Sequence, residues 1–309
     1  MALYKNNAGA LTAINEVRIE LERDIQRLSE QNLDAIFGLE FVATEFEHNG
    51  LRLDSVAFDR STNSFVIIEY KRDKSFSVVD QGYAYLALLL NNKAEFILLY
   101  NENTGRQLTK AAVDWTQSRV IFVAQNFTIH QQQAINFKDM PIELWQVKWY
   151  DNHTILFNQL KASDKTESIK TVTRDSTVQS VSNEVKVYNV ADHFTGAKSS
   201  TYELYELLRD KVLALAPSVH ENPRGNYIGF SLRENGNDTF VYTQIQVGAI
   251  KLIIPRIRPE DVNDPLGAIE YKKNSFENKN TPESILSVRT EADTDYAVSI
   301  LRQVLELKF

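Results

Sequence analysis

The chain has 309 residues, 43% hydrophobic and 24% charged, which is typical of globular proteins and long enough for about two domains. It has no cysteine, which excludes disulfides, thiolate catalysis and cysteine-ligated zinc, and it has no apolar run of about 18 residues for a membrane span. The net charge of −7 argues against strong non-specific DNA binding, although a carboxylate metal site remains compatible with it. Because the first residues do not resemble a secretory signal, we expect a cytoplasmic protein.

Helices and strands alternate in the first half of the chain. Apolar residues at three- and four-residue steps predict helices over residues 12–36 and 79–90. Alternation predicts a strand at 51–58, and the nearly continuous apolar run at 65–70 is typical of a central strand covered on both faces. Further strands are expected at residues 96–100, 120–124 and 142–150. The helix between strands predicts a βαβ crossover, hence an α/β fold with a mixed sheet flanked by helices.

The composition changes at about residue 161. Serine and threonine are frequent over the next two dozen residues and no helical stripe is evident, so we expect a linker or mobile loop at 161–200, with two short polar edge strands as the alternative. Beyond it, helices are expected at 202–215 and 291–307 and strands at 227–232, 239–246 and 249–254. The predicted organisation is a first domain at 1–160, the linker, and a smaller α+β accessory domain at 201–309 of unknown function.

Three charged residues in two neighbouring strands have a spacing that suits metal chemistry. Glu69 and Lys71 are two residues apart in one strand, so their side chains point to the same face, and a hairpin can bring Asp54 beside them. Two carboxylates suit Mg²⁺ or Mn²⁺, hard ions that prefer oxygen ligands, and the ammonium of Lys71 could orient a water or stabilise a negative transition state. We therefore predict a phosphodiester-hydrolysing site in which Asp54 and Glu69 bind the metal.

The Glu-x-Lys spacing alone is a weak signal, because it recurs at Glu184, Glu270, Glu277 and Glu306. Glu69 differs from these four glutamates because it lies at the end of an apolar strand of the kind that is usually buried. The strand before it also carries an aspartate at hairpin distance. A glutamate and a lysine at the end of a buried strand lower stability unless they form an ion pair or bind a metal. The alternative interpretation is a structural ion pair between Glu69 and Lys71 at the edge of a sheet.

The chain resembles the PD-(D/E)XK nuclease superfamily over roughly residues 16–100. The resemblance is carried by Leu53-Asp54-Ser55, by the run Val66-Ile67-Ile68-Glu69-Tyr70-Lys71-Arg72, and by the helix start Asp80-Gln81-Gly82-Tyr83-Ala84-Tyr85-Leu86. It is strongest to the branch that contains the C-terminal domain of the mismatch-specific endonuclease NucS/EndoMS. The resemblance implies a restriction-endonuclease-like sheet.

It also implies two further site residues: a glutamate from the first helix, for which Glu22 and Glu30 are both candidates, and a glutamine at the start of the next helix, for which Gln81 fits. Leu53 stands where the superfamily often has proline, and no counterpart of the endonuclease's N-terminal domain is present, so mismatch specificity is not implied.

Residues from about 199 to the end resemble a domain of unknown function that is often labelled "predicted transport protein". The resemblance is carried by the run Tyr202-Glu203-Leu204-Tyr205-Glu206-Leu207-Leu208 and by Asn226-Tyr227-Ile228-Gly229-Phe230. Because no membrane segment supports transport, we interpret this domain as a binding or dimerising module.

Several other residues are candidates for contact with a nucleic acid. They are Arg72 and Lys74 beside the site, Tyr85 in the following helix, and the alternating pair Arg256 and Arg258 in the second domain. A solvated turn and ordinary strand-edge charges explain the four basic residues equally well or better.

The sequence thus predicts a Mg²⁺- or Mn²⁺-dependent deoxyribonuclease acting on DNA, with single-stranded or structured DNA as possible substrates and a role in repair or defence implied only by the resemblance. A homodimer is expected because members of the superfamily often dimerise. The alternative function is a catalytically inactive binding module that keeps the nuclease fold.

Overall fold

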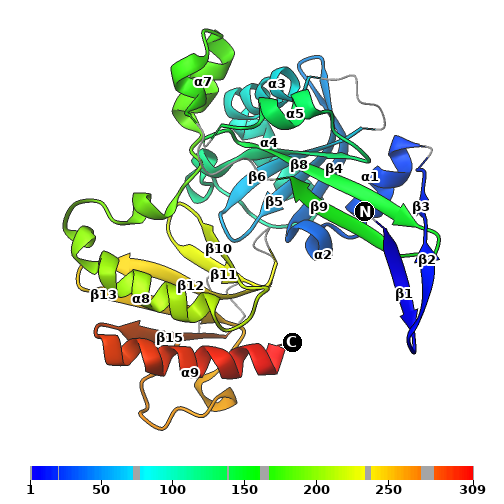
Figure 1. Cartoon of the computed structure of the whole chain (residues 1–309). Helices are drawn as coiled ribbons and strands as arrows, with labels where there is room; N and C mark the ends of the chain where they lie inside the picture. The colour runs from blue at the N-terminus through cyan, green and yellow to red at the C-terminus, as the bar shows by residue number, and fades with distance from the viewer. Residues whose placement is uncertain are drawn as a thin grey trace. The chain divides into compact units, whose positions relative to one another are not determined.

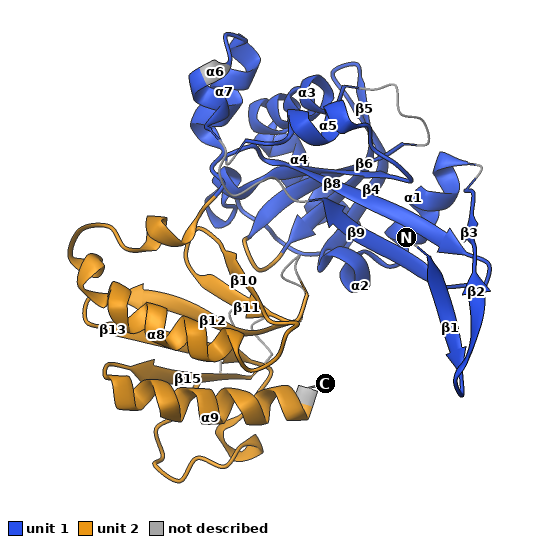
Figure 2. Ribbon diagram, in the orientation of Figure 1, with its two compact units in different colours: residues 1–59, 63–187 blue, residues 60–62, 188–309 orange. Residues whose placement is uncertain are grey.

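The structure of the chain is a computed structural model. It describes residues 2–19, 21–71, 77–137, 139–160, 167–233, 238–272 and 282–308. The chain divides into two compact units, shown in two colours in Figure 2. Unit 1 comprises residues 1–59 and 63–187, and unit 2 comprises residues 60–62 and 188–309. Within the described part of the chain, no helix is both long and apolar enough to span a membrane.

Unit 1 is built on a mixed sheet with the strand order β3-β8-β7-β6-β5-β4, in which β9 also pairs with β8. The described strands of the unit are β1 (Leu3–Asn7), β2 (Ala10–Ile14), β3 (Glu16–Val17), β4 (Glu40–His48), β5 (Leu51–Asp59), β6 (Ser64–Lys71), β7 (Arg119–Ala124), β8 (Ile142–Tyr150) and β9 (Ile155–Leu160). β6, β7 and β8 run parallel to one another, and the remaining pairs are antiparallel. β1 and β2 form a separate hairpin.

Helices cover both faces of this sheet (Figure 1). They are α1 (Glu22–Glu30), α2 (Leu33–Phe37), α3 (Val78–Asn91), α4 (Lys93–Thr104), α5 (Ile129–Ala134), α6 (Ile169–Val172) and α7 (Ser176–Glu184), with short 3₁₀ helices at η1 (Lys110–Ala112) and η2 (Trp115–Gln117). α3, α4 and α7 share one apolar core with one face of the sheet, and α1 and α2 share another with the opposite face. The predicted mixed sheet flanked by helices is confirmed.

Unit 2 is an antiparallel sheet with the order β10-β11-β12-β13-β15-β14 and helices α8 and α9 packed together against it (Figure 1). Its elements are η3 (Val190–His193), η4 (Gly196–Thr201), α8 (Tyr202–Leu213), β10 (His220–Pro223), β11 (Ile228–Ser231), β12 (Thr239–Gln246), β13 (Ala249–Pro255), η5 (Pro259–Asp261), β14 (Glu270–Lys272), β15 (Glu283–Val288) and α9 (Glu291–Lys308). The strands and both helices expected in this region are present.

Two predicted elements of unit 1 are wrong. Residues 10–17 form strands where a helix was expected over 12–36, and the helical part is divided between α1 and α2. Residues 96–100, expected as a strand, lie inside α4, where Phe96 and Tyr100 are buried four residues apart while Leu98 is 51% exposed. A short apolar run does not distinguish the two structures, and here the helical spacing of the buried rings decides.

The segment expected as a linker at 161–200 contains helices in its described part. Val178 and Val181, three residues apart on one face of α7, and Val185 just after its end are buried in the core of unit 1. The hydroxyl of Ser182 lies 3.2 Å from that of Tyr83 in α3. These few valines anchor α7 despite the polar composition, so compact unit 1 extends to residue 187.

Candidate active site

The site begins where β5 and β6 part. Their pairing runs from Asp59↔Ser64 to Ser55↔Ile68, whereas β6 remains paired with β7 as far as Lys71↔Ala124. One residue before Ser55, the Asp54 side chain takes the place of a strand partner: its Oδ2 accepts a hydrogen bond from the backbone N–H of Tyr70 at 2.9 Å. Asp54 is thereby held at the fork between the two strands.

Glu69 and Lys71 lie together at the end of β6. Nζ of Lys71 is 2.6 Å from Oε1 of Glu69, and the Glu69 residue is only 3% exposed. From α3, Nε2 of Gln81 donates to the same Oε1 at 2.9 Å. Because Ser77 accepts from the Asp80 N–H and so caps the start of α3, the first turn of this helix holds Gln81 against the sheet.

Tyr85 follows Gln81 by one helical turn and belongs to the same cluster. Its hydroxyl accepts from Nε2 of Gln81 at 2.6 Å and donates to the carbonyl of Arg52 at 3.3 Å. Burial first, and the charge of Glu69 second, raise the pKa of the Tyr85 phenol. Tyr85 therefore stays protonated at neutral pH and can act as a hydrogen-bond donor.

The electrostatics of Asp54 are unusual for a carboxylate. Burial and the negative charge of Glu69 raise its pKa to about 6, against the lowering effects of the Tyr70 N–H and of Lys71. Glu22 in α1 adds a smaller raising effect. Two carboxylates thus face a common, poorly solvated region, and a cation placed between them would relieve their repulsion.

Three residues of α1, spaced four apart, meet this region in different ways. The charge of Glu22 acts on Asp54, whereas Glu30 accepts hydrogen bonds from Ser55 at 2.7 Å and from Gln26 at 3.0 Å. Gln26 also donates to the backbone carbonyl of Asp54 at 3.1 Å. Glu22 thus influences the charge of Asp54, whereas Glu30 is hydrogen-bonded to the neighbouring Ser55.

The side chains of the cluster offer a divalent cation a carboxylate oxygen, but few further ligands. Among the described residues Oε2 of Glu69 is buried and has no hydrogen-bond partner, although Oε1 has two. Within the same ranges no group of three or more His, Cys, Asp or Glu is arranged around one point. This donor set suits an ion such as Mg²⁺, which proteins often bind through one or two carboxylates while it keeps several waters.

The other four predicted contact residues, apart from Tyr85, lie outside the described part of unit 1. Arg72 and Lys74 lie outside the described residues. Arg256 and Arg258 belong to unit 2, where both are exposed beyond the end of β13 and Arg258 lies 3.7 Å from Glu260. β13 ends at Pro255 and Arg256 has a φ of +62°, but Ile257 between the two exposed arginines is buried.

Gln26 and Ser55 are residues of the site that the sequence analysis missed. Gln26 lies midway between Glu22 and Glu30, so a polar face of the helix with four-residue spacing was the available signal. Ser55 is fully buried next to Asp54, and a serine in an apolar strand beside a charged residue is a comparable signal.

The fold and the cluster define a class of protein. It is an α/β protein in which two carboxylates, a lysine and a glutamine lie together where β6 extends beyond its pairing with β5. A protein of Haemophilus influenzae, described as uncharacterized, is 37% identical over 313 aligned residues, which cover 99% of this chain and the whole of that protein. The chain belongs to the same family as this protein. No protein-family model matches the chain.

Two solved structures show partial likeness. One is a repair endonuclease from Pyrococcus abyssi, with 19% identity, a TM-score of 0.23, and coverage of 39% of this chain and 45% of that one. The other is an EndoMS–double-stranded DNA complex, with 16% identity, a TM-score of 0.23, and coverage of 38% and 43%. The chain spans less than half the length of either.

Proposed function

We propose that unit 1 is a metal-dependent deoxyribonuclease of the PD-(D/E)XK kind, with a restriction-endonuclease-like sheet. The observation that carries the proposal is the buried Glu69 beside the partly buried Asp54: one oxygen of Glu69 has no hydrogen-bond partner among the described residues, and Lys71 contacts the other. Asp54 and Glu69 would bind Mg²⁺ or Mn²⁺. When bound, such an ion activates water and neutralises charge on a scissile phosphate.

The chain's own residues have distinct roles in this proposal. Lys71 exchanges its contact with Glu69 for the phosphate or the attacking water, where its ammonium stabilises developing negative charge. Gln81 orients the carboxylate of Glu69, and Tyr85 exchanges its 3.3 Å hydrogen bond to the Arg52 carbonyl for one to a phosphate oxygen or water. Glu22 adds negative charge that favours the cation.

Cleavage assays test the proposal directly. Single-stranded, duplex and branched DNA are incubated with Mg²⁺, Mn²⁺ or EDTA, and we expect cleavage only with metal. Lys71→Ala should lower the rate by roughly 100-fold or more, the usual cost of removing a group that stabilises transition-state charge. Lys170→Ala, which removes an exposed lysine of α6, serves as the matched control and should cleave like the native chain. Cleavage that persists in Lys71→Ala contradicts the assigned site.

An inactive binding module remains the second candidate. The observation that favours it is the short Lys71–Glu69 ion pair, which can satisfy both charges without any metal. No cleavage of any DNA, together with no heat of Mn²⁺ binding by calorimetry, would support this candidate. A homodimer is a separate proposal: light scattering of the full chain should then give twice the 35.4 kDa chain mass.

A further inference from the structure

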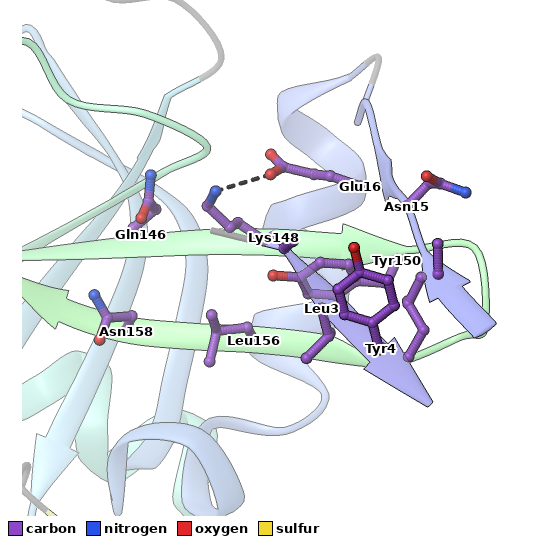
Figure 3. Close-up of a pocket in the computed structure, with 12 residues that line it drawn as sticks. Leu3, Tyr4, Asn15, Glu16, Gln146, Lys148, Tyr150, Leu156 and Asn158 are labelled. Atoms are coloured by element: carbon purple, nitrogen blue, oxygen red, sulfur yellow. Dashed lines mark hydrogen bonds and ion pairs between the residues drawn. The ribbon is translucent and has the colours of Figure 1, made fainter. Parts of the chain in front are cut away.

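A cavity of about 540 Å³ lies in unit 1 between the β1–β2 hairpin and strands β8 and β9 (Figure 3). Its size is within the range of small-molecule sites. Tyr4 and Tyr150 lie at one end of it, and the amide side chains of Gln146 and Asn158 lie at the other. Lys148 and Leu156 lie between the two ends.

The cavity shares a face of the sheet with the candidate active site. The register pairs Lys71 with Ala124, Ala124 with Gln146, and Gln146 with Asn158, so these four residues form one row across four strands. Side chains of directly opposed residues point to the same face, and neighbouring strands are about 4.8 Å apart. The amide end of the cavity is therefore roughly 10–14 Å from the backbone of Lys71, a few nucleotides along a DNA strand.

The chemistry of the lining selects a flat, neutral, hydrogen-bonding group. Tyr4 is 52% exposed and Leu156 40% exposed, so aromatic and apolar surfaces are open to a ligand. Nζ of Lys148 is 2.8 Å from Glu16, and this pairing leaves little net charge to attract a phosphate. Nε2 of Gln146 donates to the Gln125 carbonyl at 3.0 Å and to Asn126 at 3.3 Å. Gln146 would therefore offer its Oε1 as an acceptor, and Asn158 its whole amide. Hydrogen-bonding groups beside aromatic rings are how proteins recognise unpaired bases.

We propose that this cavity binds an unpaired nucleobase of a DNA strand whose backbone reaches Lys71. The choice of ligand rests on the proposed function of unit 1. The occupied cavity favours substrates with single-stranded segments over fully paired duplex, because a base in a duplex cannot enter it without leaving its stack.

Binding measured in EDTA tests the inference separately from catalysis. Fluorescence anisotropy with the full chain compares a labelled single-stranded oligonucleotide with a blunt duplex. Tyr4→Ala should weaken single-strand binding by about fivefold or more, which corresponds to the loss of one stacked base. Tyr4→Phe keeps the ring and should bind within about twofold of the native chain. Leu11→Ala, at a 65% exposed position of the same hairpin that does not line the cavity, is the control for hairpin folding.

Abasic substitution locates the base. Replacing one base at a time along the oligonucleotide should weaken binding to the native chain at one or two positions only, and Tyr4→Ala should be insensitive at those positions. Tyr4→Ala that binds single strands like the native chain, an equal loss for blunt duplex, or no DNA binding by the native chain would each overturn the inference. Tyr4-dependent binding without cleavage in metal would uphold it while the proposed nuclease activity fails.

Discussion

The carboxylate of Asp54 is held where its charge is unfavourable. Its Oδ2 accepts the Tyr70 N–H, which fixes the side chain, while burial and Glu69 raise its pKa to about 6. A residue that lowers the stability of the metal-free protein but can bind a cation is typical of functional sites, where stability and activity compete.

Asp54→Asn should raise the free energy of unfolding of the metal-free protein in EDTA, by an amount that depends on pH. Because the folded-state pKa of Asp54 lies above the ordinary aspartate value of 3.8, the folded state binds this proton more tightly, and the contribution of Asp54 to native stability rises as the pH falls through 6 toward 4. Asparagine carries no charge and can still accept the Tyr70 N–H. The variant should therefore be more stable than the native chain by about 1–2 kcal/mol at pH 8, after allowance for partial exposure, with the difference shrinking below pH 6. Urea unfolding at pH 8 and pH 5 measures this; a less stable variant at pH 8 would contradict it.

The two glutamates of α1 differ in their partners, and this difference predicts different roles. Glu22 affects the charge balance of Asp54, so Glu22→Gln should weaken Mn²⁺ binding by about tenfold, within the range for residues that support metal ligands. Glu30 accepts from Ser55 and Gln26, so Glu30→Gln should mainly lower the free energy of unfolding, by about 1–3 kcal/mol. Calorimetric titration and urea unfolding of both variants distinguish these effects. The reverse pattern would assign Glu30 to the metal.

At the scale of elements, the sequence predicted best where burial is complete. β6 and β7 are buried along almost their whole length, and such β-branched runs have few other interpretations. β4 and β9 were missed because they are edge strands with mostly polar or exposed residues. The closeness of Glu69 and Lys71 followed from strand periodicity, but the place of Gln26 depended on how α1 docks, which only tertiary packing determines.

The docking of α3 depends on Gly82. A Cβ at this position would lie 2.5 Å from Cδ1 of Ile142 and 3.4 Å from the ring of Phe122. Gly82→Ala gains about 1 kcal/mol of helix propensity, but overpacking typically costs 1–3 kcal/mol, so we expect a net loss of about 1 kcal/mol.

Ile142→Val removes the clashing methyl, so the double variant Gly82→Ala/Ile142→Val should be more stable than the sum of the two single effects predicts. Chemical unfolding of the four proteins gives this coupling energy. Strict additivity would show that α3 shifts as a whole instead.

At the scale of the whole molecule, each unit has its own apolar core. The buried clusters of unit 1 draw on residues up to Val185, and those of unit 2 on residues from Phe194 onward. The site residues Asp54, Glu69, Lys71 and Gln81 all belong to unit 1. A substitution that destabilises the core of unit 2 should therefore leave metal binding by unit 1 unchanged.

Phe230 offers the test, because its ring is fully buried in the core of unit 2. Phe230→Ala should destabilise that core by about 3–5 kcal/mol and lower the temperature of one thermal transition. Mn²⁺ binds unit 1 in our proposal, so it should raise the temperature of the other transition by mass action, and by the same amount in the native chain and in Phe230→Ala. Differential scanning calorimetry with and without Mn²⁺ follows both transitions. A single transition that responds to both the substitution and the metal would mean that the two cores unfold as one cooperative unit, although their buried clusters share no residue in the part of the chain that the structure describes.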